Sequence, residues 1–196
     1  MATDRRTSKD LIRDLSALEG SKCTECSRLL CGHHTLVSLV MGFKNAPRCA
    51  ACLAAALDHP YERFRDQVVE LVNHRDCYRS GWRWADRQEG VGPSPRPPCL
   101  WPNGTAEAEK GKGAVAAPGK NPPPAPDALW DAGDMGCGDL VLELRLRLTR
   151  MNPGQVLKLT ARDPGAPEDL PAWCRLTGHD LVQSEPPVYW IRKKES

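Results

Sequence analysis

Residues 131–182 read DAGDMGCGDLVLELRLRLTRMNPGQVLKLTARDPGAPEDLPAWCRLTGHDLV and contain the features that decide the fold of the C-terminal half. One cysteine, Cys137, directly follows Gly136 at the point where a polar loop gives way to an apolar segment. A thiol at the start of an ordered element ionises readily when that element is a helix, because the helix N-terminus stabilises the thiolate. Cys137 is therefore the first candidate for chemistry in this chain.

The segments on either side predict strands, turns and one helix. An Asp163-Pro164 pair is a typical helix start, and Gly178 is a typical helix end. Asn152-Pro-Gly and Glu185-Pro-Pro predict turns. Short apolar or alternating segments predict strands at residues 128–131, 155–161, 180–184 and 188–192.

The leucine-rich run at residues 140–148 is ambiguous. Leucine occupies every even position of it, and this period of two favours a strand. Read as a helix, the same run still has a coherent apolar face that contains Leu140, Leu144 and Leu148. Periodicity alone favours the strand.

The order of these motifs resembles the TusA/SirA family of small sulfur-carrier proteins over residues 129–194. The resemblance rests on the Gly-Cys pair, the leucine run, Pro-Gly, the strand ending in Asp-Pro-Gly-Ala, the segment Asp169-Leu-Pro-Ala-Trp-Cys-Arg-Leu-Thr-Gly-His179, and a closing aromatic strand. It implies an α+β fold, a two-layer βαβαββ sandwich. In such a fold the leucine run is the first helix and Cys137 lies at its N-terminus.

The same resemblance implies a role in sulfur trafficking. Cys137 would receive sulfane sulfur as a persulfide from a donor, such as a cysteine desulfurase or a rhodanese-like protein, and pass it to an acceptor protein. This would make the chain a sulfurtransferase that needs neither metal nor nucleotide for the transfer. A second thiol, Cys174, could relay sulfur, although its place beside Leu170 and Trp173 also fits a small residue at the edge of the core.

One departure from the family pattern concerns the residues after the cysteine. The family continues as Cys-Pro-x-Pro, whereas this chain reads Cys137-Gly138-Asp139-Leu140. Without the prolines the first turn loses its preset backbone. The negative charge of Asp139 also opposes formation of a thiolate at Cys137. The alternative function is therefore a non-enzymatic metal-binding or interaction protein that uses a degenerate carrier scaffold.

The proline content divides the chain of 196 residues. Ten of the 18 prolines lie between Pro93 and Pro126, where Gly, Ala and Lys are also frequent, as in a flexible spacer. We therefore expect a Cys-rich domain at residues 1–88, a linker at residues 89–126 and the carrier-like domain at residues 127–196. Domains of this size often need a metal or a partner to be stable.

The N-terminal domain combines helical patterns with two Cys-x-x-Cys pairs. Apolar residues at helical spacing predict helices near residues 8–19, 34–43, from 49 onward and from 61 onward. The two pairs can supply four thiolates to one tetrahedral ion, which makes a structural zinc site the leading hypothesis. Two other interpretations remain. The thiols could form an iron–sulfur site that also uses Cys31, or they could be ordinary buried cysteines. The predicted ligands are Cys23, Cys26, Cys49 and Cys52, with Cys31, His33 and His34 as alternates.

Charge and hydropathy argue against two classes of partner. The formal net charge is +2, with basic and acidic residues interspersed, so we expect no direct binding of nucleic acid. No apolar run approaches the roughly 18 residues of a membrane span, and the N-terminus has no export segment. Nine cysteines, an odd number, suit ligands or reactive thiols in a reducing compartment better than disulfides. We therefore expect a cytoplasmic protein.

Overall fold

The computed structural model describes residues 8–90, 92–102 and 124–195. The described residues divide into two compact units, one within Arg6–Ala108 and one within Glu109–Ser196. We call them the helical unit and the sheet unit and describe each by itself. Every described helix is too short or too polar to cross a membrane. The predicted domain boundaries at residues 88 and 126 stay predictions.

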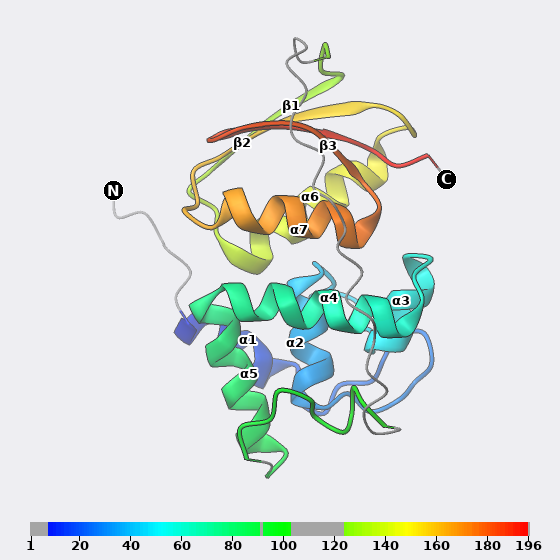
Figure 1. Cartoon of the computed structure of the whole chain (residues 1–196), viewed down its shortest axis with the longest axis vertical. Helices are drawn as coiled ribbons and strands as arrows, with labels where there is room; N and C mark the ends of the chain where they lie inside the picture. The colour runs from blue at the N-terminus through cyan, green and yellow to red at the C-terminus, as the bar shows by residue number, and fades with distance from the viewer. Residues whose placement is uncertain (1–7, 91, 103–123, 196) are drawn as a thin grey trace. The chain divides into compact units, whose positions relative to one another are not determined.

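The helical unit is built around one short apolar helix. Residues 32–40 form this helix, and all nine are buried, so side chains cover it on every side. A Cβ added at Gly81 would lie 3.1–3.2 Å from side-chain carbons of Leu36, Leu11 and Leu15. Glycine at this position therefore lets the last helix approach the first two closely. The helices are α1 (Ser8–Ala17), α2 (Gly32–Val40), α3 (Ala50–Ala56), α4 (Tyr61–His74) and α5 (Asp76–Gln88) (Figure 1).

The apolar pattern after Pro60 predicts continuous helix, but the structure has two helices. Arg75 is extended, with φ −117° and ψ 131°, and it separates α4 from α5. A straight helix over both segments would be about 40 Å long, longer than a domain of this size can cover. The break lets α5 fold back, so Trp82 and Tyr78 join the core. The helix predicted from residue 61 onward therefore ends at His74, and Cys77 lies in α5.

Part of the expected linker packs against the helical unit. Leu100 is 1% exposed, and its carbonyl accepts a hydrogen bond from the Tyr61 hydroxyl at 3.0 Å. Trp82 Nε1 donates to the carbonyl of Ser94 at 2.9 Å. Prolines restrict this segment without preventing it from burying a leucine. Residues 103–123, where most of the spacer-like composition lies, are outside the described part of the chain.

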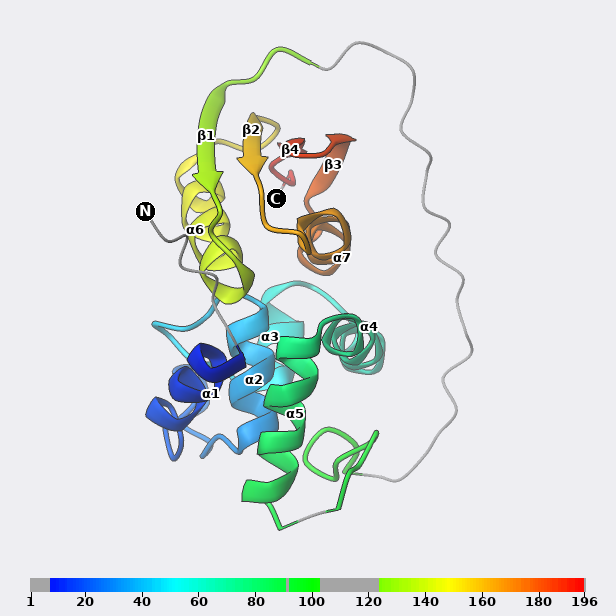
Figure 2. The same ribbon diagram turned by 90° about the vertical axis from the view of Figure 1, so that its left-hand side faces the viewer.

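The sheet unit has the order β-α-β-α-β-β, which confirms the α+β fold that the resemblance implies. The sheet order is β1-β2-β4-β3, with β1 parallel to β2 and β4 antiparallel to both of its neighbours. Both helices lie on one face of the sheet (Figures 1 and 2). The elements are β1 (Ala128–Gly133), α6 (Cys137–Arg150), β2 (Val156–Ala161), α7 (Ala166–Thr177), β3 (Asp180–Glu185) and β4 (Val188–Arg192).

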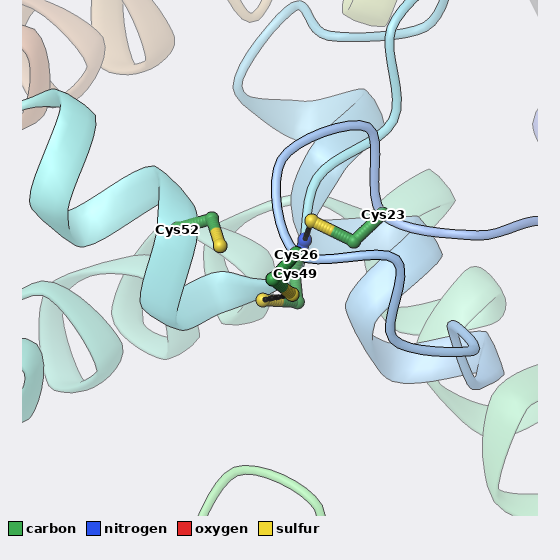
Figure 3. A group of neighbouring side chains, drawn as sticks. All are labelled: Cys23, Cys26, Cys49 and Cys52. Atoms are coloured by element: carbon green, nitrogen blue, oxygen red, sulfur yellow. Dashed lines mark hydrogen bonds between the residues drawn. The ribbon is translucent and has the colours of Figure 1, made fainter.

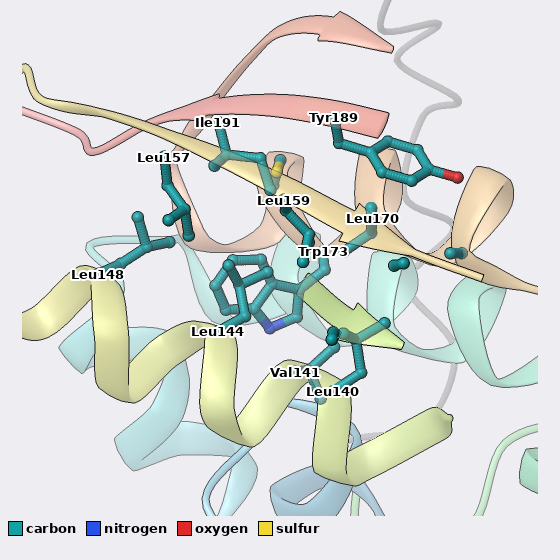
Figure 4. Close-up of a cluster of buried hydrophobic side chains, with 14 residues drawn as sticks. Leu140, Val141, Leu144, Leu148, Leu157, Leu159, Leu170, Trp173, Tyr189 and Ile191 are labelled. Atoms are coloured by element: carbon teal, nitrogen blue, oxygen red, sulfur yellow. The ribbon is translucent and has the colours of Figure 1, made fainter. Parts of the chain in front are cut away.

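The leucine run forms helix α6, against its alternating pattern. Its helical face points into one core that is closed by the inner face of the sheet and by Trp173 of α7 (Figure 4). Each of these large apolar side chains contributes about 2 kcal/mol when fully buried. The buried residues of this face are Leu140, Val141, Leu144 and Leu148.

Helix α7 ends as the sequence predicts. Gly178 has φ 76°, the left-handed conformation that glycine adopts most easily, and it closes the helix. The next residue, His179, stacks on Trp173 with ring centroids 5.5 Å apart. Its Nδ1 accepts a hydrogen bond from the backbone N–H of Lys194 at 3.1 Å, which ties the C-terminal segment to α7.

This contact generates a pH prediction. Burial, together with the positive charges of Lys194 and Lys193, lowers the pKa of His179 from 6.5 to about 4. The unfolded chain therefore binds a proton near pH 6.5 that the folded chain does not bind until about pH 4. The contribution of His179 to the free energy of unfolding therefore decreases as the pH falls between these values.

We expect the ring signals of His179 in NMR spectra of the full chain to titrate near pH 4. The other four histidines lie in the helical unit. The histidine signal that is missing from the spectrum of a His179→Gln variant is therefore that of His179. That variant should also lose less stability than the wild type between pH 6.5 and 4. Titration of this ring near pH 6.5 in the folded protein would contradict the buried, neutral histidine.

Candidate functional site

Two tight segments of the helical unit bring the four predicted thiols together (Figure 3). Cys23 and Cys26 belong to a turn that is closed by a bridge between Lys22 and Leu29. In this turn the N–H of Cys23 donates to the carbonyl of Arg28 at 2.8 Å. The other two thiols lie at the start of α3: Cys49 is its N-cap residue, and Cys52 follows in its first turn.

The geometry of these thiols suits a tetrahedral metal ion. The four sulfur atoms lie within 4.8 Å of one another. Cys26 Sγ and Cys49 Sγ are 3.8 Å apart, and two sulfurs on one tetrahedral zinc ion are about 3.8 Å apart. The backbone N–H of Cys49 donates to Cys23 Sγ at 3.3 Å, so the two segments already contact each other through one sulfur.

The electrostatics of this cluster favour a bound cation. Burial raises the pKa of Cys23, but hydrogen bonds from the backbone N–H groups of Cys49, Cys26 and Glu25 outweigh it and lower that pKa to about 6. Burial raises the pKa of Cys52 well above its ordinary value, and hydrogen bonding with the neighbouring thiols raises it further. One thiolate is therefore favoured and a second is opposed. A bound cation removes that opposition, because it stabilises several thiolates at once.

The three alternate ligands do not join this cluster. Cys31 Sγ and His34 Nδ1 are 3.3 Å apart and group with Cys99. His33 is fully buried, and its Nε2 lies 3.1 Å from the carboxylate of Asp86. A hydrogen bond with the Cys99 thiol lowers the pKa of Cys31, and the same bond raises the pKa of Cys99. Cys99 is a residue that sequence reasoning left without a role, because it follows the prolines of the expected linker.

In the sheet unit, Cys137 is the first residue of α6. Gly136 is the N-cap residue, with φ −108° and ψ 165°. A Cβ added to Gly136 would lie 3.3 Å from Oδ1 of Asp163, the residue before Pro164 at the approach to α7. The N-terminus of α6 and the segment that leads into α7 are thus close neighbours. A carboxylate therefore borders the backbone next to Cys137, a contact that the sequence spacing does not reveal.

The loop before α6 is fixed to the end of β2. The guanidinium group of Arg162 binds the carboxylate of Asp131 through two hydrogen bonds, at 3.0 and 2.9 Å. The backbone N–H of Arg162 donates to the carbonyl of Gly133 at 2.8 Å. Gly133 has φ 58°, so a glycine suits this turn. These contacts set the path of the chain as it enters α6.

Comparisons with known proteins identify the sheet unit. A family model described as sulfurtransferase TusA matches residues 130–193. The sulfur carrier protein TusA of Pseudomonas putida (strain W619) is 37% identical over 73 residues, which cover 35% of this chain and 91% of that protein. The sulfur carrier protein TusA of Pseudomonas aeruginosa (strain UCBPP-PA14) is 38% identical over 72 residues, with the same coverage of both chains.

The chain belongs to the TusA family. These matches cover its C-terminal third and leave the helical unit outside. Membership supports a sulfur-trafficking role for the TusA domain. It says nothing about the cysteine clusters of the helical unit, so their function must be argued from geometry alone.

The other predicted thiol, Cys174, lies in the core of the TusA domain. It is 2% exposed and packs in the same cluster as Leu170 and Trp173. Burial raises its pKa to about 12. A thiol in this environment stays protonated, which fits a core residue better than a relay.

The geometry of the four-thiol cluster predicts the effect of removing one ligand. We expect Cys26→Ser and Cys49→Ser each to lower the metal content of the purified chain by one ion. They should also lower the unfolding temperature of the helical unit, because metal binding contributes to the folding free energy. Elemental analysis and thermal unfolding measure both effects.

The matched control is Cys77→Ser, a half-buried thiol in the same unit that belongs to neither cysteine cluster. This variant should keep the full metal content. Unchanged metal content in both cluster variants would refute the ligand set.

Proposed function

We propose that this protein carries sulfane sulfur as a persulfide on Cys137 between a donor protein and an acceptor protein. The observation that carries the proposal is the position of this cysteine. It is the first residue of α6 in a domain that belongs to the TusA family. The unpaired N–H groups of a helix N-terminus stabilise a thiolate, and they can equally stabilise the terminal sulfur of a persulfide anion.

The transfer is an exchange between sulfur atoms. The thiolate of Cys137 attacks the terminal sulfur of a donor persulfide. A new S–S bond forms on Cys137, the S–S bond of the donor breaks, and the donor cysteine leaves as a thiolate. One S–S bond replaces another, so no external oxidant or reductant is needed, and the proton of the donor persulfide stays on the transferred sulfur. Release repeats the exchange with an acceptor thiolate as the nucleophile. Cys174 takes no part, because its thiol is buried and protonated.

The donor classes that suit this step form cysteine persulfides themselves. A cysteine desulfurase or a rhodanese-like protein has this chemistry, and the acceptor is a second protein with a thiol or another sulfur nucleophile. Such exchange requires reduced thiols, so we place the protein in the cytoplasm. Within this proposal the four-thiol cluster holds a structural zinc ion that stabilises the helical unit.

The second candidate function is that of a metal-binding or interaction protein with an inactive carrier scaffold. It is favoured by Gly138 and Leu140, which stand where the family pattern has its two prolines, and by the negative charge of Asp139 between them. The two functions differ in one measurable property, the ability of Cys137 to hold labile sulfur.

We expect the full chain, incubated with cysteine and a cysteine desulfurase, to gain one sulfur atom that disappears on reduction. Intact-mass spectrometry measures this gain. Cys137→Ser should gain none, whereas Cys77→Ser should load like the wild type. If the wild type gains no labile sulfur from desulfurase or rhodanese donors, the carrier proposal fails and the second candidate stands.

A second prediction concerns the charge beside the thiol. Asp139 lies in the first turn of α6, two residues after Cys137. Removing its negative charge with Asp139→Asn should stabilise the thiolate. We expect alkylation of Cys137 at neutral pH to be about two- to fivefold faster, since the repulsion between two like charges a few ångströms apart in water is about 1 kcal/mol or less.

The rate is measured by mass spectrometry of the peptide that contains Cys137 after exposure to iodoacetamide. The control is Glu143→Gln, one turn further along the same helix, which should change the rate little because it is six positions after Cys137 in the chain and its carboxylate lies 4.0 Å from the guanidinium group of Arg147. Equal rates in Asp139→Asn and the wild type would show that the charge does not act on Cys137.

A further inference from the structure

A second group of metal-ligating side chains lies in the helical unit, apart from the four-thiol cluster. It consists of Cys31, His34 and Cys99, and we call it the Cys-His-Cys cluster. One ligand atom of each residue lies within 4.8 Å of the other two. Cys31 Sγ and His34 Nδ1 are 3.3 Å apart. Within the described ranges, no further Cys, His, Asp or Glu joins this group.

The Cys-His-Cys cluster repeats the construction of the four-thiol cluster. Cys31 is the N-cap residue of α2, and His34 follows three residues later in its first turn. Cys49 and Cys52 have the same two positions at the start of α3. The remaining ligands come from non-helical segments in both clusters, the turn at residues 22–29 in one and Cys99 in the other. Two helices of this unit therefore begin with the same pair of ligand positions.

Contacts that involve no metal hold the ligands on α2 in place. The Thr35 hydroxyl donates to the carbonyl of Cys31 at 3.1 Å, which fixes the start of the helix. A Cβ added at Gly32 would lie 2.9 Å from Cβ of Ala85, so α2 begins directly against α5. His33 Nε2 is engaged with Asp86 on α5, whereas His34 Nδ1 lies 3.3 Å from Cys31 Sγ.

Cys99 is held by the segment on either side of it. Its neighbour Leu100 is buried, and the carbonyl of Leu100 is bound by the Tyr61 hydroxyl. Trp101 lies under the guanidinium group of Arg65, whose carbon is 4.5 Å from the ring centroid. These contacts anchor the segment immediately after Cys99 to α4. The thiol is therefore brought to α2 by packing and not by chance proximity in a loose loop.

We propose that Cys31, His34 and Cys99 bind a second metal ion, a divalent cation of borderline softness such as Zn²⁺, through three protein ligands and an open fourth position. Two thiolates and one imidazole suit such a cation. With both thiols deprotonated the loaded centre has no net charge, so its open position can take either a water molecule or an anion. Cys31 and Cys99 are partly exposed, which leaves access for a ligand. A thiolate is the anion whose softness matches the site. This proposal does not depend on sulfur carriage by Cys137.

Metal content tests the number of sites. The full chain, purified with zinc present and passed through a desalting column, should contain two zinc ions per chain. Cys99→Ala should contain one, Cys26→Ser should contain one, and Cys77→Ala should contain two. A wild type with a single ion, or a Cys99→Ala variant with two, would overturn the second site.

Cobalt substitution tests the open position in the wild type, so it does not depend on how a variant folds. Addition of a small thiol such as 2-mercaptoethanol should change the visible d–d absorption of the cobalt-loaded chain in a saturable way. In Cys99→Ala, the remaining cobalt in the four-thiol cluster should show no such change. A wild-type spectrum that saturating thiol leaves unchanged would mean that the fourth position is closed, and the proposal of an open site would fail.

Discussion

The parallel pairing of β1 with β2 is the constraint on which the TusA domain depends. Two parallel strands that are neighbours in the chain need a crossover segment, and a helix on one face of the sheet is the usual solution. The residues between these strands include the leucine run, which supplies this crossover helix as α6. Because the strand ends a few residues before Cys137, the crossover also places this cysteine at the N-terminus of a helix. The position of Cys137 at a helix N-terminus therefore follows from strand pairing.

The same constraint explains which parts of the fold can be predicted from the sequence. The four strands, the start of α7 and its end at Gly178 follow from local patterns of apolar residues, proline and glycine. The secondary structure of the leucine run does not follow from such patterns, because leucine at every second position also fits a strand with one apolar face. Only the order of the other motifs, read as a resemblance, decides for the helix. The pairing that enforces it is non-local and leaves no mark within residues 140–148.

In the helical unit, the four-thiol cluster can be predicted from the sequence, but the break at Arg75 and the position of Cys99 cannot. The two Cys-x-x-Cys pairs are local signals, and the structure brings all four thiols together. The break at Arg75 was not predictable, because the apolar residues keep helical spacing across it and the reason for the break is the size of the unit. Cys99 was missed for a similar reason. Its role depends on the packing of Leu100 and Trp101 against α4, and proline-rich composition gave no hint of that contact.

The acidic residues at the start of α6 have a consequence for selectivity. Asp139 lies in the first turn of α6, and the carboxylate of Asp163 borders Gly136. These carboxylates repel small thiolates and other dissolved anions and so oppose the attraction of the helix N-terminus, whereas a protein partner can offset the repulsion with a complementary basic surface. A sulfur atom held there would be exchanged slowly with the free thiol pool and quickly with a matched protein. The loss of the preset proline turn would then be accompanied by better discrimination between protein partners and free thiols. This discrimination is a property of the exchange rates.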